Sequence, residues 1–186
     1  MSRVFHRAGA PVSGQKVMLA TPTYDKLGAA YTEALFHSSA ALSSAGIAVE
    51  LCILSGNCHV DDARNFLVRN FLESDCTDLV FLDADVAWPE KHLVELCQYD
   101  RDVVAGLYPL KSRQERFPVR LLPGEFHAED DGCLEVESVP TGFLRIKRWV
   151  LEKMAWLAPK YLRPDDPRGP VPLIFGRTLE DQTRWG

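Results

Sequence analysis

Two aspartates close an apolar segment near the middle of the chain. The run Leu79-Val80-Phe81-Leu82 has the composition of a buried strand, and Asp83 and Asp85 follow it with one residue between them. A buried strand has no structural need of two charges at its carboxyl end, and unpaired buried carboxylates are costly, so a cationic partner is implied. Carboxylate oxygens are ligands of Mg²⁺ and Mn²⁺, which take further oxygens from a diphosphate. The pair therefore predicts a divalent metal and the phosphates that it carries.

The spacing of the two acids predicts where they lie. In an extended segment residues i and i+2 face the same side, so Asp83 and Asp85 would present both carboxylates at the carboxyl edge of the sheet. If Asp85 already lies in the following turn, the two side chains still converge on one pocket. Open parallel sheets bind ligands at this edge. The alternative interpretation is that the acids only cap the next helix.

Alternating elements are expected to position this edge. The sequence patterns predict, in chain order, a strand over 17–20, a helix over 28–45, a strand over 47–54, a helix from Asp61 or Asp62 to Glu73, a strand over 79–83, a helix from Pro89 to Tyr99, a strand over 102–107, short strands near 119–122 and 134–139, and a helix over 147–157. This alternation indicates an α/β fold with a parallel sheet covered on both faces and a mixed or antiparallel C-terminal edge.

Length and composition favour one domain. A chain of 186 residues is long enough for one well-buried core. We expect a flexible lead-in over 1–15, one domain over 16–158 and a loop-rich tail over 159–186. The net charge of −5 argues against a broad nucleic-acid-binding surface. The densest basic cluster, at 145–148, is interpreted as the end of a strand that enters a helix.

Cysteine usage and hydropathy bear on localisation. The five cysteines are an odd number without a Cys-x-x-Cys pair, which favours reduced thiols. No run approaches the ~20 apolar residues of a membrane helix. The first residues lack the apolar core of a signal peptide. We therefore expect no transmembrane segment and a cytoplasmic protein.

Four segments follow one another in a characteristic order: Ala20-Thr21-Pro22-Thr23-Tyr24, Asp62-Ala63-Arg64-Asn65, Phe81-Leu82-Asp83-Ala84-Asp85 and Val139-Pro140-Thr141-Gly142-Phe143. In this order they resemble the metal-dependent glycosyltransferases of the GT-A fold, and the chain is particularly similar to small family 2-like enzymes of bacteria and phages. The resemblance covers roughly residues 16–158. It implies the GT-A nucleotide-diphospho-sugar transferase fold, a Rossmann-like three-layer sandwich with a mainly parallel central sheet.

The resemblance also implies roles for individual residues. The loop after the first strand would contact the nucleotide base and ribose through Pro22, Thr23 and Tyr24. Asp83 would approach the ribose or metal and Asp85 would bind the metal. Arg64 would lie near the diphosphate, and Thr141 and Gly142 near the donor sugar or acceptor. Lys111, after a strand end, is a further candidate for a phosphate.

Each role has a plainer alternative. Tyr24 could be an exposed turn residue, and Arg64 could pair with Asp61 across the first helical turn. Thr141 and Gly142 could supply only turn chemistry. Lys111 could be a solvated lysine.

The C-terminal segment departs from the family pattern. Such enzymes commonly take a catalytic base from a paired acid, for which Glu180 and Asp181 are the candidates. Gln182 to Trp185 is similar to the Gln-x-x-Arg-Trp element of processive relatives, one residue short. A histidine often completes the metal site, yet no histidine follows Asp181. Either another group is the third metal ligand or the chain is a shortened form.

The resulting hypothesis is a hexosyltransferase-like enzyme. It would transfer a sugar from a UDP- or GDP-sugar to an unknown acceptor, with Mn²⁺ or Mg²⁺ on the diphosphate. If the enzyme is inverting, Asp181 or Glu180 would deprotonate the acceptor hydroxyl. One alternative is a degenerate GT-A module that binds a nucleotide without catalysis. Another is a haloacid-dehalogenase-like phosphatase with Asp83 as nucleophile, although Ala87 stands where that family has a small hydroxyl residue. Donor sugar, base, acceptor and oligomeric state stay unassigned.

Overall fold

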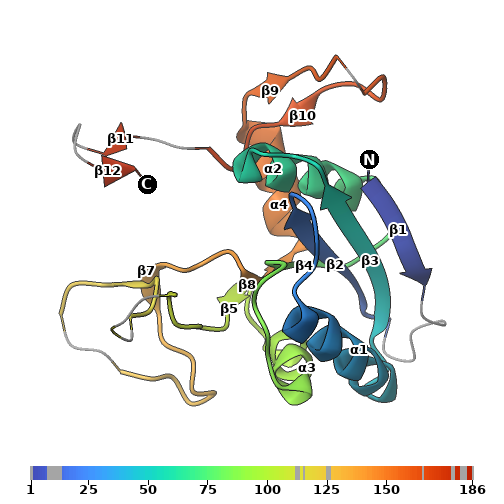
Figure 1. The fold of residues 1–186 in the computed structure, drawn as a ribbon. Coiled ribbons are helices and arrows are strands. Elements are labelled where there is room, and N and C mark those ends of the chain that lie inside the picture. Colours follow the sequence, from blue (N-terminus) through green and yellow to red (C-terminus); the bar gives the residue numbers. More distant parts are fainter. Residues whose placement is uncertain are drawn as a thin grey trace.

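The chain forms a mixed α/β domain around a six-stranded sheet (Figure 1). The computed structural model describes residues 2–7, 14–111, 114, 116–124, 127–164, 166–176, 179–180 and 184–185, with the side chains of 2–7 and of 179 onward left aside. The sheet has the strand order β1-β3-β2-β4-β8-β5. Its strands are β1 (Ser2–Arg7), β2 (Lys16–Thr23), β3 (Ala48–Ser55), β4 (Asp78–Leu82), β5 (Val103–Ala105) and β8 (Phe143–Lys147).

Four of these strands run in one direction. β2 pairs in parallel with β3 and β4, while β8 lies antiparallel between β4 and β5. β1 pairs antiparallel with β3 at the opposite edge. The predicted parallel sheet with a mixed C-terminal edge is therefore confirmed. The three remaining strand pairs are separate two-stranded sheets: β6 (Arg120–Leu121) with β7 (Val136–Ser138), β9 (Lys160–Tyr161) with β10 (Val171–Pro172), and β11 (Leu179–Glu180) with β12 (Arg184–Trp185).

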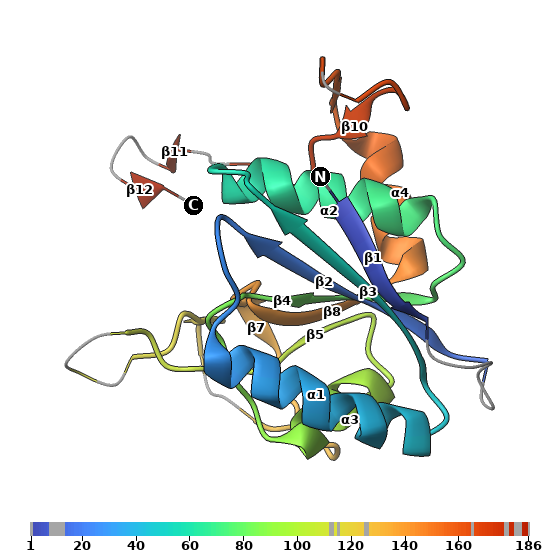
Figure 2. The ribbon, with the colours of Figure 1, turned by 45° about the vertical axis from the view of Figure 1, so that its right-hand side comes forward.

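Helices cover both faces of the sheet. Helices α1 (Ala29–Ser44) and α3 (Glu90–Gln98) lie on one face, and α2 (Val60–Leu72) and α4 (Arg148–Leu157) on the other (Figures 1 and 2). The expected helix positions are thus confirmed to within a few residues. Among the described residues, no helix is long and apolar enough to cross a membrane.

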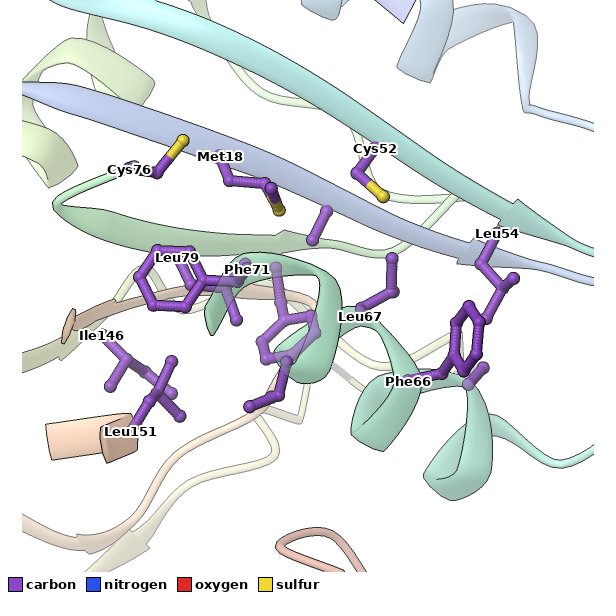
Figure 3. Packing of buried hydrophobic residues seen from close by; sticks show 14 of the residues in the cluster. Met18, Cys52, Leu54, Phe66, Leu67, Phe71, Cys76, Leu79, Ile146 and Leu151 are labelled. Atoms are coloured by element: carbon purple, nitrogen blue, oxygen red, sulfur yellow. The ribbon is translucent and has the colours of Figure 1, made fainter. Parts of the chain in front are cut away.

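The central strands are apolar on both sides because both sides are buried. In β2, Met18 and Ala20 point to the α2 and α4 face, whereas Val17 and Leu19 point to the α1 and α3 face. Figure 3 shows the first of these two cores, in which α2 packs Phe66, Leu67 and Phe71 against the sheet. The alternation of side chains along a strand thus anchors a helix layer on each side.

The end of α1 follows local chemistry, whereas the start of α2 differs from the expected one. Gly46 adopts a φ of 74° after α1, and the amides of Gly46 and Ile47 donate to Ser43 O and Leu42 O at 3.0 Å, which is a Schellman motif. Helix α2 begins at Val60 after His59 and has no side-chain cap, so the expected cap by Asp61 or Asp62 is wrong. Asp62 instead accepts hydrogen bonds from Asn57 and Tyr161.

The structure differs from the sequence-based expectations in three strands. Strand β1 lies in the stretch expected to be a flexible lead-in. Its apolar and polar residues alternate only weakly, and its backbone pairs with β3. Strand β8, inserted between β4 and β5, contains a buried arginine, Arg145, which interrupts its apolar pattern. Strand β2 continues through Pro22 and Thr23, which were expected in a loop.

Residues 160–164 and 166–175 are part of the packed domain although the sequence predicts a loop-rich tail there. Val171 is fully buried in the core beneath α2. The Asn65 side chain donates to Phe175 O at 2.8 Å and accepts from the amides of Ile174 and Phe175 at 2.9 and 2.7 Å. One buried amide therefore fixes this segment to α2, a long-range contact that local sequence does not encode.

Candidate functional site at the carboxyl edge of the sheet

The two aspartates lie in a tight turn directly after β4. The Asp83 amide donates to Gly142 O at 2.9 Å, and the Val86 amide donates to Asp83 O at 3.0 Å, which closes a turn over 83–86. Asp85 therefore lies in the turn and not in an extended strand, the second of the two expected arrangements. The Gly28 amide donates to Ala84 O at 2.8 Å, so the loop before α1 packs on the same turn.

Each aspartate is paired with a different cation. Asp83 Oδ1 accepts from Arg64 Nη2 at 2.8 Å, and Asp85 Oδ2 accepts from Lys111 Nζ at 2.5 Å. The side chain of Asp83 is 27% exposed and that of Asp85 is 62% exposed. Arg64 reaches Asp83 from α2, so the alternative pairing of Arg64 with Asp61 is wrong. The unpaired buried Nε of Arg64 is a spare donor beside the carboxylate.

Gly142 brings the backbone against the carboxylate of Asp83. A Cβ atom at this position would lie 2.5 Å from Asp83 Oδ2 and 2.3 Å from the hydroxyl oxygen of Tyr108. The Gly142 amide donates to that hydroxyl at 3.1 Å. Burial and then the charge of Asp83 raise the pKa of Tyr108. Glycine is thus required here by close approach, beyond ordinary turn chemistry.

Tyr108 is a site residue that the sequence did not single out. It follows β5, whose carboxyl end meets the same edge of the sheet as β4. The sequence did contain one indication of this role, a tyrosine hydroxyl just beyond the carboxyl end of a predicted strand. Sequence alone could not use it, because the pairing of β5 with β8 is what carries Tyr108 to Gly142.

The end of β2 contributes the three residues expected to contact a nucleotide. Pro22 is buried, Thr23 is half-buried, and Tyr24 is 70% exposed. Pro22 lies two residues beyond Ala20, the last β2 residue that pairs with β4, and it still pairs with β3, so β2 extends past the end of its pairing with β4. The Gly56 amide donates to Thr23 O and Tyr24 O at 3.2 and 2.9 Å and fixes the backbone there.

The structure describes the remaining candidates, Thr141, Glu180 and Asp181, to different extents. Thr141 is half-buried and directly precedes Gly142. Glu180 belongs to β11, of which only the backbone is described, and Asp181 lies outside the described residues. The structure thus brings together Arg64, Asp83 and Gly142 with the pair of Asp85 and Lys111, while the proposed base stays a prediction.

Asp83 and Asp85 supply carboxylate oxygens, the donor type that hard divalent cations prefer. Asp83 Oδ1 is held by Arg64, and Oδ2 faces the Gly142 backbone. Asp85 is the more accessible carboxylate of the two, and its partner is one exposed lysine. Among the described residues, neither aspartate belongs to a group of three His, Cys, Asp or Glu side chains that are close enough to share an ion. The third ligand therefore stays unassigned, and oxygens of a bound diphosphate would complete the coordination.

A second cluster, of Glu50, Asp75 and Cys76, has ligand atoms close enough together to share a metal ion, but Lys16 pairs with both of its carboxylates. Lys16 Nζ donates to Glu50 at 2.9 Å and also contacts Asp75. A lysine thus already occupies the position of a cation. This cluster lies at the amino-terminal ends of β2 and β4 and does not take part in the candidate site.

Two cavities flank the sheet. One of 670 Å³ lies at the amino-terminal end of β4, beside Asp78 and Arg145. A groove of 1070 Å³ begins at Val86 and Tyr108 and runs along β5, between α3 and the β6–β7 hairpin. The aspartate turn therefore lies at one end of the larger groove.

Fold and site define a mixed α/β protein with an acidic turn at the carboxyl edge of its sheet. Comparison with solved structures finds similarity to the crystal structure of A197 from STIV, with a TM-score of 0.55 and 26% sequence identity over 81% of this chain and 70% of that chain. No protein-family model matches the sequence, and no curated protein matches it. The similarity supports the α/β architecture.

Proposed function

We propose that this protein is a metal-dependent glycosyltransferase of the GT-A type, which transfers a sugar from a nucleoside-diphosphate sugar to an acceptor. The observation that carries the proposal is the convergence of four separate segments on the turn of Asp83 and Asp85, next to the strand β2. The segments are the loop before α1, the start of α2, the chain after β5 and the segment before β8.

The proposal gives each charged group a distinct task. Asp85 would hold Mn²⁺ or Mg²⁺, and the bound metal would supply charge neutralisation for the departing diphosphate. Arg64 would orient Asp83 through their ion pair and lie near the diphosphate. Lys111 would leave Asp85 for a phosphate oxygen when a divalent cation arrives, because both cations compete for one carboxylate. Pro22, Thr23 and Tyr24 would line the nucleoside, with Thr141 and Gly142 facing the donor sugar.

A calorimetric titration of the full chain with UDP and GDP, with and without Mn²⁺, tests donor binding. We expect binding that requires the metal and that Asp85→Asn weakens by about tenfold or more. Asp100→Asn is the matched control, because Asp100 is a fully exposed aspartate next to the other end of the sheet. Absence of binding by both nucleotides with Mn²⁺ would overturn the proposal.

Catalysis needs a separate measurement. Incubation with UDP- and GDP-sugars and Mn²⁺ should release the nucleoside diphosphate, and Glu180→Gln or Asp181→Asn should abolish release without loss of nucleotide binding. Nucleotide binding without hydrolysis or transfer would instead establish the degenerate GT-A module. A covalent phosphate on Asp83 after incubation with a phosphate monoester would establish the phosphatase.

A further inference from the structure

The groove beside the aspartate turn has an open strand edge as one wall. β5 is the last strand of the sheet, and only its β8 side is paired within the part of the chain that the structure describes. The Gly106 amide donates to Phe143 O and the Lys147 amide donates to Asp102 O, both at 2.9 Å. This phase of the antiparallel ladder turns the backbone N–H and C=O groups of Val103 and Ala105 away from β8.

The unpaired edge is located inside the groove. Val103 and Ala105 both line it, and the β6–β7 hairpin forms the opposite wall. An exposed edge of this kind is a template for an added strand, and natural proteins usually cover or charge it. Here the hairpin stands off from the edge and leaves 1070 Å³ between them.

Apolar side chains are exposed along the same groove. Four of its large apolar residues have 39 to 53% of their surface exposed: Val103, Leu107, Leu121 and Leu134. They come from β5, the chain after it, and both sides of the opposing hairpin. Exposed apolar residues gathered in a concave surface mark a binding groove more than a solvated face.

The charges of the groove are mainly negative. Its lining contains four glutamates, Glu95, Glu129, Glu135 and Glu137, and one arginine, Arg101. Arg101 forms ion pairs with Asp131 at 2.7 Å and with Glu129 at 3.4 Å. Glu137 pairs with Arg120 at 3.2 Å. Glu95 and Glu135 have no cationic partner among the described residues, and both are exposed. A cationic ligand complements this lining.

We propose that the groove binds an extended, positively charged polypeptide segment, which adds a strand to the open edge of β5. Main-chain hydrogen bonds to Val103 and Ala105 would give the register, because alternate residues of an added strand face the edge. Apolar side chains would cover the exposed valine and leucines, and lysine or arginine side chains would reach Glu95 and Glu135.

The groove leads such a segment to the aspartate turn, which makes it the acceptor if the proposed glycosyltransferase activity holds. Val86, next to Asp85, and Tyr108, whose hydroxyl contacts Gly142, close the end of the groove. A serine or threonine hydroxyl oxygen of the segment would bond to the anomeric carbon of the donor while the bond from that carbon to the diphosphate breaks. The hydroxyl proton would pass to a carboxylate base, and the nucleoside diphosphate would leave.

Peptide binding can be measured without metal or nucleotide, so it stands apart from the test of the donor site. The probe is a fluorescein-labelled peptide in which lysine, threonine and valine alternate, titrated with the full chain by fluorescence anisotropy. We expect saturable binding that weakens with added salt, and at least about tenfold weaker binding when glutamate replaces lysine. Equal binding of the two peptides would overturn the proposal.

Backbone pairing has its own probe, which needs no protein variant. N-methylation of alternate peptide amides should abolish binding in the set that faces β5, while the set that faces away should tolerate it. Equal effects of both sets would overturn strand addition. Displacement of the peptide by a neutral oligosaccharide at similar concentration would also overturn the proposal, since it would identify the groove as a glycan site.

Charge reversal on the protein completes the test. Glu95→Lys and Glu135→Lys should each weaken the peptide by about fivefold, and Glu33→Lys, on the exposed surface of α1, should leave binding unchanged. Unchanged binding in both groove variants would overturn the proposal. It would also be overturned if light scattering showed that the protein is a dimer and that the peptide does not dissociate it. Peptide binding together with a failed nucleotide titration would overturn only the donor site.

Discussion

β4 has an acid at each end, and the two acids have opposite surroundings. At the amino end, Asp78 pairs with Arg145 at 2.8 Å, and their side chains are 7% and 1% exposed. At the carboxyl end, Asp83 pairs with Arg64 at the same distance, but its side chain is 27% exposed and the neighbouring Asp85 is 62% exposed. One pair is sealed in the protein and the other is open to a ligand.

The hydrogen bonds of Arg145 and Arg64 also differ between the two ends of β4. Arg145 also donates to the carbonyl oxygens of Leu96, Tyr99 and Arg101, so each of its three side-chain nitrogens has a partner. Arg64 makes one ion pair and keeps a buried Nε without a partner. A buried ion pair whose nitrogens all have partners serves the fold, whereas an accessible acid beside a less fully bonded arginine can still bind a ligand. A cavity lies beside the sealed pair as well, so a cavity alone does not identify the site.

The largest effect is expected at the sealed end. Arg145→Met should lower the free energy of unfolding by about 3–5 kcal/mol, because it leaves Asp78 buried without its cation. Arg64→Met should cost less than half as much, since water reaches Asp83. Urea denaturation of both variants measures the difference. Equal losses would contradict the distinction between the two ends.

Gly142→Ala should disturb the open end through close packing. The added methyl group would collide with Asp83 Oδ2 and the Tyr108 hydroxyl, so we expect a loss of about 1–3 kcal/mol together with weaker nucleotide binding. Gly176→Ala is the control, because a Cβ there meets no atom within 4 Å. Thermal unfolding and the UDP titration report the two effects, and a silent Gly142→Ala would show that the segment before β8 is looser than the structure indicates.

Alkaline pH should lower the free energy of unfolding, because Tyr31 is buried between α1 and the sheet. Burial raises the pKa of Tyr31 to about 12 against an ordinary value of 10.0, partly offset by its hydrogen bond with Thr21. Because the folded-state pKa lies above the unfolded value, stability that is present below pH 10 falls as the pH rises toward 12, by about 1 kcal/mol per pH unit. Denaturation at stepped pH measures this slope. Tyr31→Phe should flatten it, and an unchanged slope would refute the assignment to Tyr31.

The smallest effect on stability is expected at the most exposed pair. Lys111→Ala should change the free energy of unfolding by less than about 1 kcal/mol, because solvent screens this ion pair. The same change should strengthen binding of Mn²⁺ alone, since it removes a cation that competes for Asp85. Calorimetric titration with MnCl₂ checks this, with Lys147→Ala, which removes the lysine paired with Asp100, as the matched control. Weaker Mn²⁺ binding in the Lys111 variant would remove the proposed competition.

Local patterns were enough for the elements on which the site stands. The apolar runs of β2, β3 and β4 and the helices between them were predicted because each is repeated, buried and bounded by turn residues. The same patterns gave Asp83 and Asp85, and the resemblance to GT-A enzymes added Arg64, which the structure pairs with Asp83. Tyr108, the Asn65 contact with Phe175 and the position of β8 were out of reach, because each depends on residues that are distant in sequence.

The basic cluster at 145–148 shows the limit of composition most clearly. By sequence alone it is four residues with three positive charges. In the structure Arg145 is buried against Asp78, and Arg148 donates to the carbonyl oxygens of Phe71, Ser74 and Cys76. Two of the three cations therefore serve the fold, which agrees with the prediction of a strand end that enters a helix.

The sequence by itself determined that an α/β sheet ends in two closely spaced acids, because strand and helix periodicity and residue chemistry are local properties. Tertiary structure decided what surrounds those acids. Only the assembled sheet shows that Arg64 and Lys111 hold them separately, that Gly142 presses its backbone against Asp83, and that an acidic groove with an open β5 edge leads to the turn. Such contacts join residues that are far apart in the chain, and their geometry exists only once the strands have paired.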